Sequence, residues 1–532
     1  MDRLPIIYVR GFAGGESGIE KAVTDPFYGF NEGSVHVRVG ASGDPSFYQF
    51  ESPLLRLMIE GSGHDGAAGY RILVQGSQER YLRDAEPGSV PAASIWVHRF
   101  YDVSSSLQAI KPDADDDRQD FSIPAAAESL RRLVELVKDR TGAPRVQLVA
   151  HSMGGLVCRC LVQKVLPDRG EHALDHVDRL FTYGTPHGGI HFEVGMGLLE
   201  RLRDTFNLQG ASIFSPREMY RYLTPQARLA EVPQAPKDWQ ANRIPPEAFP
   251  AERVFCLVGT NARDYEVAMG LSAWTVGPKS DGLVQIESAF VPGARFAFVH
   301  RAHSGRFGLV NSEEGYQNLR RFLFGDLEIT ADLVDYRLPG EPDADITWQA
   351  ETRLSVRGLP IVMHEQLAAH HCPVQLEWPG ETGTADRPCP LVTTFLSSQE
   401  RRPPGASRMR YILHVRVMSL RETRGVFSFS DHLEQSADFD DMLLVDVEPP
   451  TADGAIPQAW ATWASTIGSP LRDFDQPDDA RLRDEDPAPG HWVAHVPLPG
   501  PARDLLGDRA AVRLTVQARA SADDPRYRPQ PA

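Results

Sequence analysis

Residues 145–165 read RVQLVAHSMGGLVCRCLVQKV: a short apolar strand runs directly into a helix, and Ser152 lies at the bend. Ala150 precedes this serine, and Gly154 and Gly155 follow it. Small neighbours are needed where a strand turns sharply into a helix around a serine with a strained backbone. The spacing is that of a G-x-S-x-G turn whose first glycine is replaced by alanine. A glycine-rich turn in any parallel-sheet protein would give the same short pattern.

The elements around this turn favour a parallel α/β sheet. Residues 4–9 form a continuous apolar run, as expected of a strand that is buried on both faces. Leucines and valines at helical spacing predict a helix over 125–140, which ends at the TGAP sequence of residues 141–144. The order helix, strand, turn and helix is typical of parallel sheets with right-handed crossovers.

The segment AHSMGG at residues 150–155 resembles the nucleophile elbow of α/β-hydrolases, particularly of lipase-like and esterase-like members. Two further segments are similar to those of lipase-like enzymes: TPHGG at 185–189, which follows a predicted strand, and SDGLV at 280–284. The resemblance implies an α/β fold with a doubly wound, mostly parallel sheet. It covers roughly residues 4–325.

Two stretches of the chain depart from the core pattern. Residues 16–92 have weak periodicity and many glycines, and we interpret them as an insertion that could border the active site. Residues 190–250 contain an apolar stripe at helical spacing, in a position where hydrolases of this fold carry a cap or lid. An apolar cap would suit an acyl chain and would permit transient contact with a membrane surface. The stripe also fits an ordinary amphipathic helix packed on the body.

The resemblance implies a catalytic triad of Ser152, Asp281 and His303, because serine, acid and histidine follow one another in this order in the fold. His303 lies in the loop beyond the predicted strand 295–299, where the fold places its base. His300, at the end of that strand, is the alternative base. A serine hydroxyl becomes an effective nucleophile when an imidazole takes its proton and a carboxylate orients that imidazole.

The loop Arg10-Gly11-Phe12 resembles the oxyanion-hole loop of lipase-like hydrolases, with arginine where histidine is common. The resemblance implies that the backbone N–H groups of Phe12 and Met153 stabilise the developing negative oxygen. A plain glycine turn or a phosphate-binding loop would have a similar sequence. The phosphate-binding loop is disfavoured because no Gly-Lys-Ser/Thr follows.

Several other polar residues are interpreted as structural. His187 precedes any plausible acid and lies beside a rigid proline, and Asp102 and Asp264 are weaker candidates for the acid. The acidic loop 112–120 lacks the spacing of an EF-hand calcium site. A zinc site is also disfavoured, because the spacing of the candidate ligands matches no familiar pair; those candidates are His364, His370, His371 and Cys372.

Beyond about residue 327, helical spacing nearly disappears and short alternating strands are separated by connectors rich in Pro, Asp and Gly. This pattern is typical of an antiparallel sandwich. We therefore predict a catalytic domain over residues 1–327 and a β-sandwich-like accessory domain over residues 328–532. The resemblance does not extend to the accessory domain, whose partner is not predicted.

The composition is that of a globular protein: of 532 residues, 42% are hydrophobic and 24% are charged, and the length favours two or three domains. The net charge of −17 argues against a nucleic-acid partner, since binding phosphates needs a basic surface. We expect a cytoplasmic protein. No apolar run of about 18 residues is present to span a membrane, and a predicted strand begins by residue 5, where a signal peptide would otherwise lie. The five cysteines fit no disulfide framework. Export without a cleavable signal stays open.

The resemblance implies a serine hydrolase that cleaves carboxylic esters through an acyl-enzyme. Its expected substrate is a small-molecule or lipid acyl ester with a hydrophobic acyl group. This mechanism requires no metal and no organic cofactor. The same triad serves acyl transfer to another acceptor and the cleavage of thioesters or amides, so these reactions are alternatives. A binding or scaffold protein that retains the hydrolase fold, with the β domain as its working surface, is the alternative from another class. The complete set of triad residues weighs against it.

Overall fold

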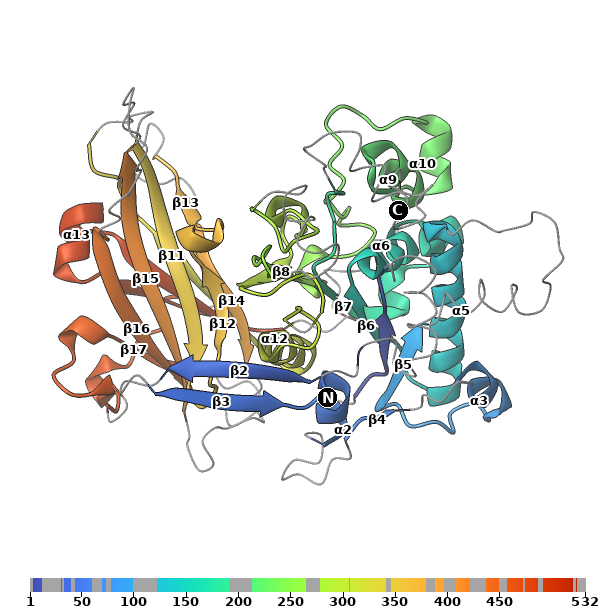
Figure 1. Cartoon of the computed structure of the whole chain (residues 1–532), viewed down its shortest axis with the longest axis horizontal. Helices are drawn as coiled ribbons and strands as arrows, with labels where there is room; N and C mark the ends of the chain where they lie inside the picture. The colour runs from blue at the N-terminus through green and yellow to red at the C-terminus, as the bar shows by residue number, and fades with distance from the viewer. Residues whose placement is uncertain are drawn as a thin grey trace. The chain divides into compact units, whose positions relative to one another are not determined.

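A computed structural model gives the structure of the chain (Figure 1). It forms two compact units. The first, here called the N-terminal unit, contains residues 1–296, 301–316 and 521–532; the second, the β unit, contains residues 297–300 and 317–520. The residues described are 3–11, 30, 33–39, 44–59, 69–72, 78–98, 122–190, 213–264, 278–305, 307–340, 346–378, 388–396, 408–421, 437–448, 457–471, 474–486, 491–519 and 523.

A seven-stranded sheet forms the centre of the fold in the first part of the chain. Its strands are β1 (Ile6–Val9), β4 (Arg71–Ile72), β5 (Ser94–His98), β6 (Val146–His151), β7 (Val177–Tyr183), β8 (Val254–Gly259) and β9 (Arg295–Val299). Their order is β4-β5-β1-β6-β7-β8-β9, and the pairings from β4 through to β8 are parallel. All the residues of β1 and β8 are buried, as expected of strands covered on both faces. The predicted doubly wound, mostly parallel sheet is therefore confirmed.

The helix predicted before the turn is α5 (Ile123–Thr141), and its ends have clear chemical causes. The hydroxyl of Ser122 accepts a hydrogen bond from the backbone N–H of Ala125 and caps the first turn. Gly142 ends the helix with φ of 67°, a left-handed conformation that glycine adopts without penalty. Beyond Ser152, α6 (Met153–Cys160) continues through a π-helical turn over 161–165 into α7 (Leu166–Asp168).

The described parts of the two predicted insertions contain regular structure. Residues 16–92 include α2 (Pro53–Ile59), α3 (Gln78–Asp84) and a hairpin of β2 (Ser34–Val39) with β3 (Pro45–Phe50) (Figure 1). Residues 213–250 contain α9 (Pro216–Leu223) and α10 (Gln226–Glu231). The apolar stripe from Met196 to Phe206, which suggested a cap, lies outside the described residues.

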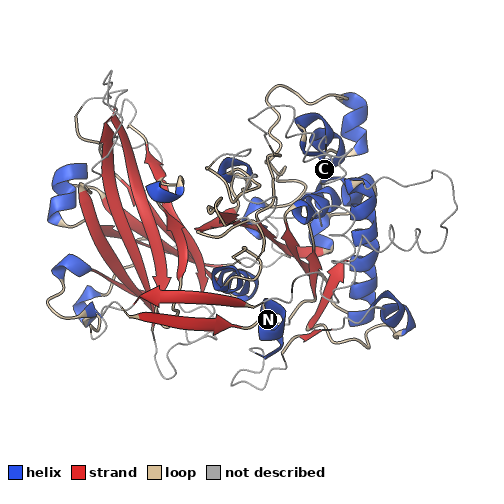
Figure 2. Cartoon of the chain, viewed as in Figure 1, coloured by secondary structure: helices blue, strands red, loops and turns tan. Residues whose placement is uncertain are grey.

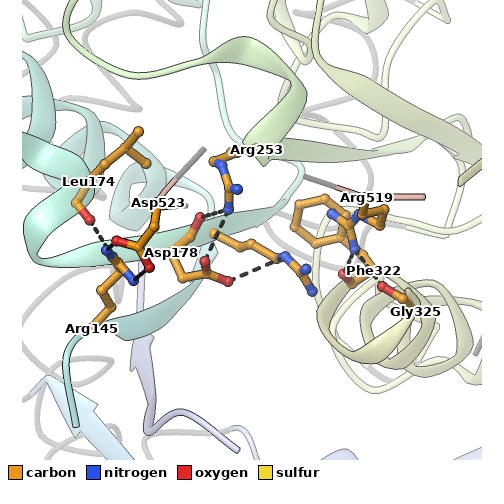
Figure 3. Close-up of polar contacts among 9 residues, drawn as sticks. Arg145, Leu174, Asp178, Arg253, Phe322, Gly325, Arg519 and Asp523 are labelled. Carbon is orange, nitrogen blue, oxygen red and sulfur yellow. Dashed lines mark hydrogen bonds and ion pairs between the residues drawn. The ribbon is translucent and has the colours of Figure 1, made fainter. Parts of the chain in front are cut away.

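Ion pairs lie at the amino-terminal ends of the central strands (Figure 3). Arg145, just before β6, contacts Asp523, a residue from the last part of the chain. Arg253, just before β8, donates to the carboxylate of Asp178 at the start of β7 over 3.0 Å. The strands therefore carry these charged contacts at one end, and the candidate site described below lies at the other.

The β unit consists mostly of strands, whereas helices flank the sheet of the N-terminal unit (Figure 2). Its strands are β10 (Leu327–Val334), β11 (Ile346–Val356), β12 (Val362–Gln366), β13 (Val374–Leu376), β14 (Cys389–Leu396), β15 (Met409–Arg421), β16 (Phe439–Glu448), β17 (Gln458–Trp463), β18 (His491–Pro497) and β19 (Ala511–Ala518), and its helix α13 is Gly500–Leu506. One sheet has the order β14-β10-β19-β18 and another the order β12-β11-β15-β16-β17, with β13 paired to β11. Apolar side chains from both sheets form one core cluster, to which Ile329 of β10, Leu413 of β15 and Trp492 of β18 belong.

These sheets confirm the predicted antiparallel β fold of the C-terminal part of the chain. The division between the two units falls within α12 (Glu313–Phe324). No helix among the described residues combines the length and hydropathy that a membrane span requires.

Candidate active site

Ser152 lies between β6 and α6 in a backbone conformation that serine rarely adopts, with φ of 55° and ψ of −131°. Such a conformation costs about 1–3 kcal/mol and persists only where the surroundings enforce it. Two hydrogen bonds to the backbone of Ser152 enforce this conformation. The backbone N–H of Ser152 donates to the carbonyl of Tyr183 over 2.9 Å, and the hydroxyl of Thr185 donates to the carbonyl of Ser152 over 2.8 Å.

Close packing explains the small residues around Ser152. A β-carbon on Gly154 would lie 2.3 Å from the carbonyl oxygen at the end of β1, and one on Gly155 would lie 2.2 Å from the hydroxyl of Thr185. A β-carbon on Gly11 would lie 2.5 Å from the β-carbon of Ser152 itself. The loops that follow β1 and β7 therefore press directly against the turn, and larger side chains would push them away.

The structure brings Ser152, His303 and Asp281 together, although 151 residues separate the serine from the histidine. The Nε2 atom of His303 lies 2.9 Å from the hydroxyl of Ser152, and its Nδ1 atom lies 2.8 Å from Oδ2 of Asp281. The other carboxylate oxygen of Asp281 accepts hydrogen bonds from the backbone N–H groups of Leu283 and Val284, over 3.0 and 2.8 Å. Both polar edges of the imidazole and both carboxylate oxygens thus have partners.

The loops after neighbouring strands hold the acid and the histidine in place. The backbone N–H of His303 donates to the carbonyl of Asp281 over 2.8 Å. Gly184, which follows β7 with φ of 51°, leaves room for both side chains: a β-carbon there would lie 2.8 Å from Oδ2 of Asp281 and 3.1 Å from Nδ1 of His303. Gly259, the last residue of β8, approaches Asp281 equally closely. The carboxyl ends of the parallel strands therefore converge on this site.

Residues 125–206, which include α5, β6, Ser152 and α6, match the model of a family described as a PGAP1-like alpha/beta domain. This match adds to the parallel strand order and to the strained serine at the turn. The central sheet and the turn at Ser152 have the α/β-hydrolase fold. The α/β-hydrolase fold that the sequence motifs suggested is therefore confirmed.

Two solved structures are similar to this chain at low sequence identity. The product of the gene lin2722 from Listeria innocua is 14% identical, with a TM-score of 0.25 over 60% of this chain and 94% of that one. The mature form of the lipase BlEst2 from Bacillus licheniformis is also 14% identical, with a TM-score of 0.29 over 60% of this chain and 91% of that one. No curated protein is significantly similar in sequence.

The amino-terminal end of α6 directly follows Ser152. Met153 is the first residue of α6, and the first N–H groups of a helix have no acceptor within it. The partial positive charge of a helix amino terminus also favours a negative oxygen there. Gly11, in the loop after β1, packs against Ser152. The predicted second donor, Phe12, lies outside the described residues.

His151 is a part of the site that the motifs did not single out. Its Nε2 atom donates to the backbone carbonyl of His303 over 2.9 Å, and the two rings lie 4.9 Å apart. Burial and the proximity of His303 lower the pKa of His151, so its ring stays neutral. The residue supports the loop that carries His303. In the sequence, this role of His151 is indicated only by its position next to Ser152.

Arg159 in α6 is a second residue that sequence reasoning missed. Its guanidinium is fully buried and donates to the carbonyl oxygens of His187 and Arg243, over 2.9 and 3.1 Å. Burial lowers the pKa of Arg159 to about 10. His187 is itself buried, with Nε2 lying 3.2 Å from the hydroxyl of Thr182. These contacts connect the helix after Ser152 to the TPHGG loop.

The remaining candidates have other surroundings. His300 is exposed, and its ring stacks on that of His370 at 3.8 Å. Asp264 accepts a hydrogen bond from the amide of Asn261 over 2.7 Å. Asp102 and the acidic loop 112–120 lie outside the described residues.

The histidines and cysteine considered for zinc have other surroundings in the structure. Within the described ranges, no group of three or more His, Cys, Asp or Glu residues is arranged to hold a metal ion. His364 is buried, and its Nε2 atom lies 3.1 Å from the amide oxygen of Gln366. Burial lowers its pKa to about 4, so the ring is neutral. The thiol of Cys372 lies near backbone carbonyls.

Proposed function

We propose that this protein is a serine hydrolase that cleaves carboxylic esters through an acyl-enzyme. Ser152 would be the nucleophile, His303 the general base and acid, and Asp281 the carboxylate that orients the histidine. The observation that carries the proposal is the unbroken series of contacts from the hydroxyl of Ser152 through both ring nitrogens of His303 to Asp281, at 2.9 and 2.8 Å. This arrangement activates a serine hydroxyl.

In the proposed reaction, Nε2 of His303 accepts and donates the protons that are transferred. When the oxygen of Ser152 attacks the ester carbonyl, its proton passes to Nε2 of His303. The tetrahedral intermediate carries a negative oxygen, which the backbone N–H groups of Met153 and Phe12 would stabilise. Collapse of this intermediate breaks the bond to the alcohol, and Nε2 of His303 returns the proton to the departing oxygen. Water, activated by the same nitrogen, then releases the acid from Ser152.

Asp281 has two tasks in this scheme, and its hydrogen bonds suit both. A proton on Nδ1 of His303 leaves Nε2 free to accept the proton of the serine, and a carboxylate oxygen 2.8 Å from Nδ1 favours this tautomer. The negative charge also stabilises the imidazolium that forms during the reaction. The backbone donors at Leu283 and Val284 keep the carboxylate from rotating.

Labelling with a fluorophosphonate probe tests the proposal, because such probes react with activated serines. We expect one site of modification, at Ser152, located by mass spectrometry of peptides. Ser152→Ala should remove both the label and the hydrolysis of a short aryl ester such as p-nitrophenyl butyrate. Ser89→Ala, which changes an exposed serine elsewhere in the same unit, is the matched control and should leave both unchanged.

A folded protein that takes up no label at Ser152 would contradict the proposal. So would a Ser152→Ala variant that still hydrolyses the ester at the parent rate. Circular dichroism and the midpoint of thermal unfolding establish that each variant is folded before it is assayed.

A further inference from the structure

Thr185, the first residue of the TPHGG loop, is fully buried and contacts the turn at Ser152. Its hydroxyl donates to the carbonyl oxygen of Ser152 over 2.8 Å. The same oxygen accepts the backbone N–H of Gly155 over 3.0 Å, within the first turn of α6. Thr185 therefore supplies a hydrogen bond from a different loop to the carbonyl group that precedes this helix.

The carbonyl of Ser152 and the N–H of Met153 belong to one planar peptide group. In the trans form these two groups point in opposite directions, so a hydrogen bond that holds the carbonyl also sets the direction of the N–H. The two ends of this peptide group face different loops. Its oxygen faces Thr185 after β7. Its nitrogen lies beside the loop after β1, since a β-carbon on Gly11 would be 3.2 Å from it.

A series of contacts fixes the loop that carries Thr185. The backbone N–H of His187 donates to the carbonyl of Thr185 over 2.8 Å. The guanidinium of Arg159 donates to the carbonyl of His187 over 2.9 Å. The backbone N–H of Gly188 donates to the carbonyl of Ser288 over 2.9 Å. The hydroxyl of Thr185 is therefore held in place by its surroundings, as a group that orients a neighbour must be.

We infer that Thr185 is a positioning residue, whose hydroxyl orients the peptide group between Ser152 and Met153 and so aims the N–H of Met153 at the negative oxygen of the tetrahedral intermediate. This inference rests on the proposed function, in which that N–H is one of two donors to the oxygen. A hydrogen bond weakens steeply as its donor turns away from the acceptor. A donor that is fixed in advance also costs no reorganisation during the reaction.

Thr185→Val tests this role, because valine has nearly the shape of threonine but no hydroxyl. With p-nitrophenyl butyrate, kcat should fall by about 10- to 100-fold, up to the lower end of the loss known for removing an oxyanion donor, and KM should stay within about twofold. Thr185→Ser keeps the hydroxyl, so its kcat should stay within about threefold of the parent. A trifluoromethyl ketone forms a negatively charged tetrahedral adduct with a serine. Its inhibition constant should rise in Thr185→Val by the factor by which kcat/KM falls.

Two measurements separate this role from a loss of stability and from a displaced histidine. Thr141→Val makes the same exchange at another buried threonine, whose hydroxyl donates to the carbonyl of Val137 over 2.6 Å. Its kcat should stay within about twofold of the parent. Gly184, which packs against His303, directly precedes Thr185. The acid limb of the pH profile of kcat reports the pKa of the general base and should move by less than about 0.3 pH unit in Thr185→Val.

The outcomes distinguish this inference from the function on which it rests. Absence of fluorophosphonate labelling at Ser152 in the parent protein overturns the proposed hydrolase, and the inference with it. If the parent is labelled, a kcat of Thr185→Val within about twofold of the parent overturns the inference alone. Equal losses in Thr185→Ser or Thr141→Val, an unchanged inhibition constant, or a shifted acid limb also overturn it. Thr185→Ala replaces Thr185→Val if the latter does not fold, and the same criteria apply to it.

Discussion

Replacing Asp281 by asparagine tests the orienting role of this residue with almost no change in shape. The backbone N–H groups of Leu283 and Val284 both donate to one oxygen of the side chain, while the other oxygen faces Nδ1 of His303. An asparagine has only one oxygen, and the two backbone donors require it. Its NH₂ group must then face Nδ1, which has to accept a hydrogen bond. The proton of the imidazole therefore moves to Nε2, the nitrogen that should accept the proton of Ser152.

The structure also indicates how strongly this wrong tautomer is favoured. Turning the amide around would leave two backbone donors unsatisfied at a position where Asp281 is 1% exposed. Each unsatisfied buried donor costs about 1–3 kcal/mol, so the two together cost about 2–6 kcal/mol. The upper end corresponds to a loss of about 10⁴-fold in kcat, the size known for the same exchange in a serine protease triad.

Steady-state hydrolysis of p-nitrophenyl butyrate measures this loss, and the rate of fluorophosphonate labelling at Ser152 should fall in parallel. Asp264→Asn is the matched control, since it makes the same exchange at an aspartate that accepts a hydrogen bond from Asn261. We expect its activity to stay within about twofold of the parent. Activity of Asp281→Asn within about tenfold of the parent, in folded protein, would refute the reasoning from the tautomer.

Three further predictions concern other parts of the molecule. His303→Ala should lower kcat by about 10⁴-fold or more, whereas His300→Ala should stay within about twofold; equal losses would contradict the assignment of the base. Arg410→Ala should lower the free energy of unfolding of the β unit by about 3–5 kcal/mol in urea titrations, because it leaves the buried carboxylate of Asp446 without its partner at 2.7 Å. Burial lowers the pKa of His98 to about 3 in the folded protein, whereas a histidine in the unfolded chain has a pKa of about 6.5. Between these two pH values the unfolded chain therefore binds more protons than the folded protein. Stability should therefore fall by about 1.4 kcal/mol per pH unit between about pH 6 and pH 3 on account of this residue, and His98→Gln should reduce that slope.

Local sequence patterns predicted the central fold well. The buried strands of a parallel sheet are continuous apolar runs. Ser122 and Gly142 cap the two ends of α5, and both are residue types that favour helix ends. The superfamily followed from short segments in which backbone geometry dictates the residue type. Gly154, for example, lies where any β-carbon would collide with the carbonyl oxygen at the end of β1.

Contacts between distant parts of the chain could not be predicted in this way. The pair between Arg145 and Asp523 joins residues 378 positions apart, and no periodicity marks either of them. Arg159 is buried on a helix that otherwise has an apolar composition, and its carbonyl partners become visible only in three dimensions. His151 is similar: its hydrogen bond to the carbonyl of His303 depends on how two loops meet. Such roles depend on tertiary geometry and leave no local pattern.

The strained backbone of Ser152 has a consequence for thermal stability. Glycine adopts positive φ without the cost that a β-carbon brings, so Ser152→Gly would relax the turn and raise the melting temperature while abolishing any chemistry of the hydroxyl. A chain optimised only for durability would have drifted to glycine at this position. With serine at this position, the turn holds an oxygen atom at one point in space at the expense of backbone strain that glycine would not have.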